Sequence, residues 1–506
     1  MVAITRGVSV IGVNAVPVDI ETELSQGLPG FSIIGLGDAA VQEARYRIQS
    51  ALRSSDLQLP HKKVTINLAP ADLRKDGAAL DLPMALGLAA AAQLVPPSIV
   101  EGTVALGELA LSGALRPVRG VLPAADLARR LGCPRIVVPA ENGAEALAAA
   151  GCQDMEVIAA PCLSALLTHL RGERRIPVPR PHPSPEGAAL PDLKDVRGQL
   201  EPRRALEIAA AGGHNLLLVG NPGSGKTMLA RRLPSILPEL EPEARLSVTK
   251  IWSAAGLTVR FSGLVRERPF RAPHHTLSQA ALVGGGNPVR PGEVSLAHEG
   301  VLFLDEMPEL PRRMLESLRQ PLEDRRVTIC RARQTVELPA SFMLVGAANP
   351  CPCGWMGHPS GRCTCRPEEI QRYAGRLSGA LLDRIDLVVE APSLSAEELL
   401  DAEPGEASEE IRRRVLEARR RQLTARGRPN AELAGAPLRA PDHLGAAARQ
   451  TLERAAEKLD LSARSLDRVL RVSRTIADLA GRTTIEGPHV REALRFRPPR
   501  GWARRA

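Results

Sequence analysis

Apolar residues are spaced differently in successive stretches of the chain, and the change in spacing predicts its domains. Within residues 1–170, short β-branched runs alternate with runs rich in alanine and leucine. VTINLAP (residues 64–70) and RIVVPA (135–140) are typical of buried strands, and LPMALGLAAAAQL (82–94) is typical of a core helix. We therefore expect an α+β domain over residues 1–170.

A proline-rich segment follows, and the pattern changes again beyond it. Residues 171–191 contain RIPVPRPHPSPEGAALP, which lacks the apolar side chains of a core and favours a stiff, extended linker. Over residues 192–392, an apolar strand, a glycine-rich turn and a helix precede further strands, which predicts an α/β domain with a parallel sheet. Beyond that point the strand-like runs end and segments such as SLDRVLRVSRTIADLAG have helical periodicity, so residues 393–506 should form an α-helical domain.

A phosphate-binding loop is predicted where the first strand of the second domain ends. NLLLVGNPGSGKTMLARRL (residues 215–233) contains G-x-x-x-x-G-K-T between an apolar strand and a helix, the context in which this motif binds nucleotide. The glycines let backbone N–H groups converge on phosphate oxygens. We expect Lys226 to neutralise the β- and γ-phosphates of ATP and Thr227 to ligate Mg²⁺. The expected nucleotide-binding residues are Gly220, Asn221, Pro222, Gly223, Ser224, Gly225, Lys226 and Thr227.

A second motif supplies two carboxylates. In GVLFLDEMPEL (residues 300–310), a buried parallel strand would carry Asp305 and Glu306 to its C-terminal end, where ligands bind in such sheets. We expect Asp305 to hold Mg²⁺, directly or through water, and Glu306 to act as the general base for the attacking water. The alternative is an ordinary strand that ends in solvated acids, which the phosphate-binding loop upstream disfavours.

The composition of the whole chain narrows the classes of protein to consider. With 44% hydrophobic residues among 506, the chain can build several packed cores. It has no run of about 18 uncharged apolar residues and no secretory signal at its start, so we expect a cytoplasmic protein without a membrane partner. The net charge of +9 permits nucleic-acid binding, and the 2% aromatic content argues against extensive base stacking. DNA would therefore be held mainly through its phosphates.

Four cysteines lie close together in the second domain. Cys351, Cys353, Cys363 and Cys365 form the pattern C-x-C-x9-C-x-C, and four thiolates can make a closed tetrahedral Zn²⁺ site. In a reducing compartment such a cluster indicates metal binding before disulfides. Four reduced thiols, a redox pair, or His358 in place of one ligand remain alternatives, because C-x-C is tighter than the usual spacing of zinc ligands.

A basic β-hairpin is predicted between the acidic motif and the cysteines. RRVTICRARQTVELP (residues 325–339) alternates as two short strands around a central turn. Arg331 and Arg333 near its tip are candidates to bind DNA phosphates, and a solvated basic turn is the alternative. His274 and His275 have no acidic or cysteine partners at metal-ligand spacing, so we interpret them as structural or as part of an intersubunit surface.

Several longer stretches resemble the ComM/YifB group of magnesium-chelatase-like AAA+ ATPases, and the resemblance covers nearly the whole chain. They include GLPGFSIIGLGDAAVQEARYRIQSAL, VTINLAPADLRKDG, RPFRAPHHTLSQAALVGGG, AHEGVLFLDE, AANPCPCG, LLDRIDL and VSRTIADLAG. The resemblance implies that Asn349 is the sensor that orients the attacking water, that Arg384 is the arginine finger, and that Arg464 is the second sensor on a helical lid. An arginine finger reaches the ATP of a neighbouring subunit, so the resemblance implies a ring, which we expect to be hexameric. It also implies that the basic hairpin points into the central pore.

The first domain resembles a different family, the C-terminal domain of Lon proteases and of the repair protein RadA, which has the ribosomal protein S5 domain 2-like fold. The matching stretches are VTINLAPADLRKDGAALDLPMAL and VALGELALSGALRPVRGVLPAADLARRLGCPRIVVPA. Lon-type hydrolysis requires a serine nucleophile and a lysine that activates it. These positions fall at Ala79 and Leu122, so we expect the fold without peptidase activity. The RadA-like domain is a DNA-associated ring platform, which suggests a similar use here.

Three functions follow from these resemblances. The leading hypothesis is an ATP- and Mg²⁺-dependent DNA motor that binds single-stranded and branched DNA and drives branch migration during recombination of incoming DNA in natural transformation. The second is a metal-insertion motor like the magnesium chelatase ATPase subunit, which lacks the Lon-like domain. The third is a Lon-like ATP-dependent protease, which the missing serine and lysine disfavour. The basic hairpin and the positive net charge favour DNA.

Overall fold

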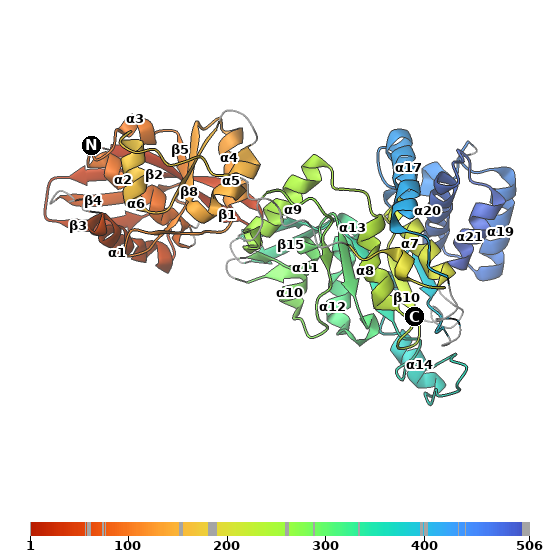
Figure 1. The fold of residues 1–506 in the computed structure, drawn as a ribbon. Coiled ribbons are helices and arrows are strands. Elements are labelled where there is room, and N and C mark those ends of the chain that lie inside the picture. Colours follow the sequence, from red (N-terminus) through yellow and green to blue (C-terminus); the bar gives the residue numbers. More distant parts are fainter. Residues whose placement is uncertain are drawn as a thin grey trace.

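The structure, a computed structural model, describes residues 2–55, 57, 62–72, 75, 77–150, 155–180, 190–258, 263–286, 289–331, 334–394, 398, 403–433, 435–440 and 442–497. An N-terminal α+β domain, a central α/β domain and a set of C-terminal helices follow one another along an elongated molecule (Figure 1). Along the length of the molecule, the three parts therefore lie in the same order as in the sequence.

The N-terminal domain is built on a seven-stranded mixed sheet with the order β3-β4-β2-β1-β5-β8-β9. Strands β1 and β2 form a long antiparallel pair, whereas β5, β8 and β9 run parallel. The predicted strands over residues 64–70 and 135–140 are confirmed as β4 and β8. The strands are β1 (Val2–Ile11), β2 (Asn14–Ser25), β3 (Gly30–Ile34), β4 (Lys63–Ala69), β5 (Thr103–Ala105), β8 (Arg135–Pro139) and β9 (Glu156–Ala160), with a small separate pair, β6 (Glu108–Leu109) and β7 (Leu115–Arg116).

One helix of this domain is buried along its whole length, which confirms the core helix that the sequence predicts. Every residue of α2 is buried, and all but one are apolar or small. The exception is Asp81, whose carboxylate accepts two hydrogen bonds from the Arg47 guanidinium, at 2.6 and 2.9 Å. The helices of the domain are α1 (Ala39–Ser54), α2 (Asp81–Ala91), α3 (Pro97–Val100), α4 (Val121–Arg130), α5 (Gly143–Ala150) and α6 (Leu163–Leu170).

The central domain has a five-stranded sheet in which all neighbouring strands are parallel, with the order β11-β14-β17-β10-β18. The strands are β11 (Phe270–Arg271), β14 (Val301–Leu304), β17 (Met343–Ala348), β10 (Leu216–Val219) and β18 (Leu387–Glu390). The helices are α7 (Leu200–Gly212), α8 (Lys226–Ile236), α9 (Pro242–Ala255), α10 (Gln279–Val283), α11 (Glu293–Leu296), α12 (Arg312–Ser317), α13 (Arg319–Asp324), α14 (Pro367–Ala374) and α15 (Gly379–Leu382). Two hairpins join them, β12 (Gly284–Gly285) with β13 (Arg290–Pro291) and β15 (Arg326–Arg331) with β16 (Gln334–Pro339).

The C-terminal helices share one hydrophobic core with the central sheet. Leu206 of α7, Leu216 of β10 and Val415 of α17 belong to the same buried cluster. A buried polar contact reinforces this packing, because the His214 ring contacts both Asp386 (Nδ1 to Oδ2, 3.1 Å) and the Thr475 hydroxyl (2.8 Å). These helices are α17 (Ser408–Arg426), α18 (Gly435–Leu438), α19 (Ala446–Leu459), α20 (Ala463–Leu479) and α21 (Gly487–Arg495), and no strand occurs among the described residues after 393.

The N-terminal domain contacts the central domain through the first turn of α4 and the helix α9. The buried Glu145 carboxylate accepts hydrogen bonds from the Ser253 hydroxyl (2.5 Å) and from the Leu122 backbone N–H (3.1 Å). Nearby, the Lys250 ammonium pairs with the buried Asp126 carboxylate at 2.6 Å. Buried charges are stable only when they are paired and hydrogen-bonded, so these contacts fix the relative position of the two domains.

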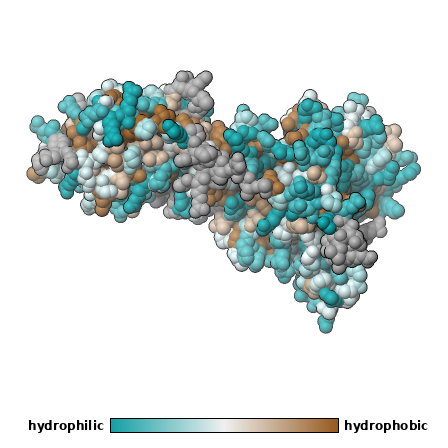
Figure 2. All heavy atoms as spheres, in the orientation of Figure 1, coloured by the Kyte–Doolittle hydropathy of each residue, from teal (hydrophilic) through white to brown (hydrophobic). Residues whose placement is uncertain are grey.

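The surface differs between the two ends of the molecule. The face shown in Figure 2 is mostly hydrophilic over the C-terminal helices and shows more apolar residues over the N-terminal domain. Among the large apolar side chains exposed on the described residues, more than half belong to the N-terminal domain: Val2, Ile4, Leu28, Ile34, Leu36, Tyr46, Leu111 and Leu131. The described part of the chain contains no helix with the length and apolar character needed to cross a membrane.

Candidate ATP site

The predicted phosphate-binding loop lies at the C-terminal end of β10 and leads into α8. Gly223 and Gly225 adopt positive φ angles of +79° and +83°, a conformation that residues with a Cβ rarely adopt. The Lys226 ammonium folds under the loop and donates to the carbonyls of Gly220 (2.6 Å) and Asn221 (2.9 Å). The loop therefore has the curved backbone and the inward-facing cation that phosphate binding requires.

The electrostatics of Lys226 reflect its position between the loop and the two carboxylates. Only 9% of the residue is exposed, and this burial lowers the pKa of its ammonium, while the charges of Asp305 and Glu306 act in the opposite direction. Bound phosphates would add further negative charge beside the ammonium and so favour its charged form.

The two acidic residues follow β14 at the same edge of the sheet, as predicted. The Asp305 carboxylate accepts a hydrogen bond from the Thr227 hydroxyl at 2.9 Å, which brings together the two oxygen ligands expected for Mg²⁺. Its second oxygen accepts the Glu306 backbone N–H, also at 2.9 Å. Glu306 itself is exposed and adopts a positive φ of +47°, so its carboxylate is free of the packed core. These residues fit a bound Mg²⁺ and a water-activating base.

The predicted sensor, Asn349, follows β17 and completes this edge of the sheet. Its side-chain oxygen accepts a hydrogen bond from the Lys226 ammonium at 3.3 Å.

The structure also places Tyr373 of α14 beside Asn349, a residue of the site that the sequence did not indicate. Burial raises the pKa of the Tyr373 hydroxyl to about 12, although a hydrogen bond with the Asn349 backbone acts in the opposite direction. Tyr373 is thus a neutral residue that contacts the Asn349 backbone through its hydroxyl.

Gln199 is another residue of the site that the sequence did not indicate. It precedes α7 and adopts a positive φ of +51°. Its side-chain amide donates to the carbonyls of Ser224 (3.2 Å) and Pro392 (2.7 Å), so it connects the phosphate-binding loop to the chain segment after β18. A single buried amide outside any motif gives no signal in the sequence, because its partners are distant along the chain.

The predicted arginine finger lies at the opposite edge of the same sheet. Arg384 precedes β18, and the Asn215 side chain, just before β10, donates to the Arg384 carbonyl at 2.8 Å. At about 3.3 Å per residue, the four-residue strand β10 separates the two edges by about 13 Å. Arg384 therefore does not join the phosphate-binding loop, Asp305 and Asn349 of its own chain.

The second predicted sensor, Arg464, lies beside Arg384 rather than beside the phosphate-binding loop. Both residues line an open cavity of about 410 Å³, together with Asp383 and Arg471. The Arg384 guanidinium pairs with Glu323 and donates to the Ala380 carbonyl at 2.7 Å. The Arg464 side chain is 76% exposed, and its one ion-pair contact among the described residues, with Asp383, is long at 4.0 Å. The cavity thus presents two arginines at a surface.

Arg468, one helical turn beyond Arg464, holds the finger segment in place and was not predicted. Its guanidinium donates to the backbone carbonyls of Leu382 (2.7 Å) and Ile385 (3.0 Å) and to the Asp383 carboxylate (3.2 Å). Helix α20 is therefore hydrogen-bonded directly to the segment that carries Arg384. A movement of the C-terminal helices would move the finger with them.

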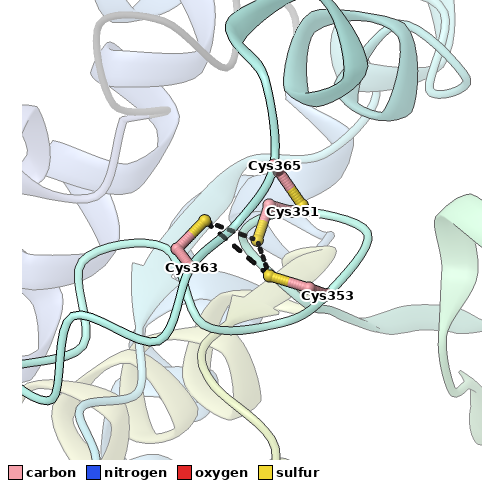
Figure 3. Close-up of side chains that lie close together, drawn as sticks. All are labelled: Cys351, Cys353, Cys363 and Cys365. Carbon is pink, nitrogen blue, oxygen red and sulfur yellow. Dashed lines mark hydrogen bonds between the residues drawn. The ribbon is translucent and has the colours of Figure 1, made fainter.

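The four predicted cysteines lie together in the loop between β17 and α14, with their sulfur atoms facing one another (Figure 3). All four are free thiols. Cys351 is buried, whereas Cys353, Cys363 and Cys365 are partly exposed. His358, the alternative ligand, is not part of this group of ligand atoms, and its Nδ1 contacts the Ser360 hydroxyl at 2.7 Å. The structure thus assembles the cluster from cysteines alone.

The basic hairpin is confirmed as β15 and β16, but its tip lies outside the described residues. Arg333 is not described, and for Arg331 only the backbone is. The base of the hairpin is well packed, with Val327, Val336 and Leu338 buried in the core of the central domain. The role of the two arginines as DNA ligands therefore stays a prediction.

Both Lon-like catalytic positions hold apolar residues, of which Leu122 is buried and Ala79 is partly exposed. Leu122 is fully buried in α4, and Ala79 lies in a short 3₁₀ helix where its carbonyl accepts the Gly107 N–H at 2.9 Å. Lys75, the nearest lysine in the sequence, is also buried, and its ammonium donates to the Pro70 carbonyl. A serine and an activating lysine are thus absent from these two positions, as the sequence already shows.

The paired histidines behave as a surface feature. His274 and His275 are exposed, and their rings lie 4.1 Å apart between centroids. The His274 Nδ1 contacts the Thr276 hydroxyl at 2.9 Å. Neither residue belongs to the four-cysteine group that could hold a metal among the described residues, and their role as structural or intersubunit residues stays a prediction.

Comparison with protein families divides the chain into three matched segments. Residues 192–399 match "Magnesium chelatase, subunit ChlI", residues 20–142 match "Subunit ChlI of Mg-chelatase", and residues 405–497 match "Magnesium chelatase, subunit ChlI C-terminal". These segments cover most of the N-terminal domain, the central domain and the C-terminal helices in turn.

Comparison with individual proteins finds relatives that match from end to end. YifB of Salmonella typhimurium, called uncharacterized, is 43% identical over 98% of this chain and 97% of its own. Competence protein ComM of Haemophilus influenzae is 42% identical over 96% of each chain. The magnesium-chelatase 38 kDa subunit of Rhodobacter capsulatus is 26% identical over 50% of this chain, and Lon protease 2 of Bacillus subtilis is 30% identical over 32%.

The geometry of the site predicts different effects for its lysine and its glutamate. Lys226→Ala should abolish ATP binding, because it removes the cation that faces the phosphates. Glu306→Gln should retain binding and stop turnover, because the amide cannot accept a proton from water. Equilibrium binding of a fluorescent ATP analogue and steady-state phosphate release measure the two effects separately. Turnover at the wild-type rate in Glu306→Gln would rule out Glu306 as the general base.

Proposed function

This chain belongs to the ComM/YifB group of magnesium-chelatase-like AAA+ ATPases, and from that membership we propose that it is a ring-shaped, ATP-driven motor that moves branched DNA. The family makes the chain an ATPase with ATP and Mg²⁺ as ligands. The finer proposal is that a hexameric ring promotes branch migration during homologous recombination of incoming DNA. The name of the Haemophilus influenzae relative, competence protein, supports a role in natural transformation.

The observation that carries the ring is the separation of the two halves of the ATP site. Lys226, Asp305 and Asn349 follow strands at one edge of the sheet, whereas Arg384 precedes a strand at the other edge. A chain with this arrangement cannot place its own arginine finger on its own ATP. Head-to-tail association brings the Arg384 edge of one subunit to the phosphate edge of the next, and repetition of this contact closes a ring.

Within such a shared site, each residue has one task. Lys226 and the backbone N–H groups of the loop bind the phosphates, and Thr227 and Asp305 hold Mg²⁺, which neutralises phosphate charge when bound. Glu306 accepts a proton as water attacks the γ-phosphorus, and the bond to the ADP oxygen breaks. Asn349 orients the water.

The neighbouring subunit's part follows from the cavity that Arg384 and Arg464 share. Both guanidiniums would face the transferred phosphoryl group and stabilise its charge in the transition state. The link from α20 through Arg468 to the finger segment would couple the C-terminal helices to each hydrolysis event.

The contact between the N-terminal domain and the hairpin supports a mechanical role for both. Val13, in the turn between β1 and β2, belongs to the same buried cluster as Val336 and Leu338 of the hairpin. At Gly12 the backbone is so close that an added Cβ would lie 2.5 Å from Val336. A hairpin that holds DNA in the pore would therefore be supported at its base by the N-terminal domain. Arg331 and Arg333 are the proposed phosphate contacts at its tip.

The two alternative functions have less support. A metal-insertion motor has less support, because the Rhodobacter capsulatus relative is 26% identical over 50% of this chain, whereas competence protein ComM matches 96% of it at 42% identity. A Lon-like protease would require a nucleophile and a base where this chain has Ala79 and Leu122.

The shared site predicts a trans effect of the arginine finger. Arg384→Ala should leave ATP binding nearly intact and lower turnover by about 10³-fold or more, because the finger stabilises transition-state charge. Subunits with Arg384→Ala should regain part of the activity when mixed with Lys226→Ala subunits, since each supplies the half-site that the other lacks. Steady-state phosphate release across a mixing series measures this recovery.

Two outcomes of this experiment contradict the shared site. The first is failure of every mixture to regain activity although mixed rings assemble. The second, more damaging outcome is equal turnover in Arg384→Ala and wild type. Arg491→Ala is a suitable control, because this arginine lies on α21, outside the finger cavity.

The proposed substrate predicts stimulation by DNA. Single-stranded or forked DNA should raise ATP turnover, and the increase should fall as salt rises, because phosphate contacts release counterions. The double variant Arg331→Ala/Arg333→Ala should lose most of the stimulation and keep the basal rate. Absence of stimulation, together with no retention of DNA at low salt, would rule out a DNA motor.

A further inference from the structure

We propose that Cys351, Cys353, Cys363 and Cys365 form a structural zinc site that holds the Asn349 segment against the phosphate-binding loop, so that zinc occupancy sets the rate of ATP hydrolysis. The metal site itself depends only on the cysteine geometry. Its effect on hydrolysis rests on the proposed function of the neighbouring ATP site.

The distances between the sulfur atoms match those of a tetrahedral metal site. With Zn–S bonds of about 2.3 Å, the sulfurs of a regular tetrahedron lie about 3.8 Å apart. The Cys351 sulfur lies 3.4 Å from that of Cys353 and 3.8 Å from that of Cys363, and the latter two are 3.7 Å apart. All four sulfurs lie within 4.8 Å of one another. A disulfide would require about 2.0 Å, so none is formed here, and the mutual spacing of the sulfurs fits a shared central ion.

The backbone around the cluster supplies a further feature of zinc sites. The Met356 N–H donates to the Cys351 sulfur at 3.3 Å. Hydrogen bonds of this kind orient a ligand and stabilise its thiolate, which is the form that binds metal. Cys351 is fully buried, and a buried thiolate without a cation beside it would carry a large desolvation cost. Zinc removes this cost.

The cluster is joined directly to both catalytic segments. Cys351 lies two residues after Asn349 in the sequence. From the other side, the Asn221 side chain of the phosphate-binding loop donates to the Gly354 carbonyl at 2.6 Å and to the Met356 carbonyl at 3.4 Å. The Asn221 amide donors are thus committed to the cysteine loop. The loop forms a bridge between Asn349 and the phosphate-binding loop.

The packing of this bridge is close enough to transmit a displacement. Gly354 has a positive φ of +82°, and a Cβ added there would lie 2.7 Å from the Pro222 ring. Between the end of β17 and the start of α14, no described residue belongs to a helix or strand. Most of this segment is exposed or partly exposed, so backbone ladders and core packing contribute little to its conformation. Four metal–sulfur bonds would supply the missing constraint.

Zinc content is the first test and does not require activity. Full-length protein, purified in reductant without chelators or metal-affinity resin, should contain about one zinc per chain. Inductively coupled plasma mass spectrometry measures this content. Cys363→Ser and Cys365→Ser should each lose most of it. Cys162→Ser, a free cysteine in the N-terminal domain, should retain it. Wild-type protein without zinc would overturn the proposal outright.

Hydrolysis is the second test and separates the metal site from its effect. Cys363→Ser should lower ATP turnover by about tenfold or more, as loss of supporting interactions around metal sites often does. Gly354→Ala should keep its zinc and show a similar loss, because all four cysteines remain while the added Cβ meets the Pro222 ring and strains a residue with a positive φ. In wild type, removal of zinc by a zinc-selective chelator should lower turnover, and added zinc should restore it, which provides the test if the variants do not fold.

The outcomes distinguish the two proposals. Wild-type turnover in zinc-free protein would overturn the effect on hydrolysis while leaving the metal site in place. Zinc-loaded wild-type protein that hydrolyses no ATP would instead contradict the proposed function of the ATP site, and the zinc measurement would stand by itself.

Discussion

Neighbouring strands of the central sheet all run in the same direction, and this constraint decides where each chemical group can act. Groups that follow a strand gather at one edge, and groups that precede a strand gather at the other. Lys226, Asp305 and Asn349 belong to the first class, and Arg384 belongs to the second. One chain therefore carries two half-sites that face in opposite directions. The ring, the shared ATP and the coupling between subunits that we propose all rest on this arrangement.

Contacts with parts of the chain that are distant in sequence hold the residues at each edge of the sheet in place. At the finger edge, Asp386 joins His214 of the sheet domain to Arg471 of α20, and Arg468 holds the finger segment. At the phosphate edge, the cysteine loop and α14 support Asn349. The N-terminal domain is fixed to α9 through buried contacts around Glu145, and to the base of the hairpin through Val13, which shares a buried cluster with Val336 and Leu338. Apart from the apolar contact with the hairpin, each attachment uses hydrogen-bonded or paired polar groups inside a packed interface, which fixes its geometry.

The sequence predicted the parts that depend on local pattern. Strands, the core helix α2, the hairpin, the phosphate-binding loop and the acidic pair each occupy a short continuous stretch whose spacing has a physical cause. Resemblance to a family added Asn349, Arg384 and Arg464, which no spacing rule would select in a chain so rich in arginine. The positions of Ala79 and Leu122 also came from resemblance alone.

The remaining residues could not be predicted because their partners lie far away along the chain. Gln199 contacts Pro392, and Tyr373 supports Asn349 only after the loop between them folds back. Arg468 is one of four arginines on α20, and only its contacts in the folded structure distinguish it from the others. The common cavity of Arg384 and Arg464 is likewise a property of the packed helices.

In the proposed ring, each ATP is bound by one subunit, and the next subunit completes the site with its arginine finger. Cryo-electron microscopy of Glu306→Gln with ATP and a forked DNA tests it most directly, because this variant should bind ATP without consuming it. The account predicts a closed ring in which Arg384 and Arg464 of one subunit contact the γ-phosphate bound by Lys226 of its neighbour. A structure in which all phosphate contacts come from a single chain would contradict it.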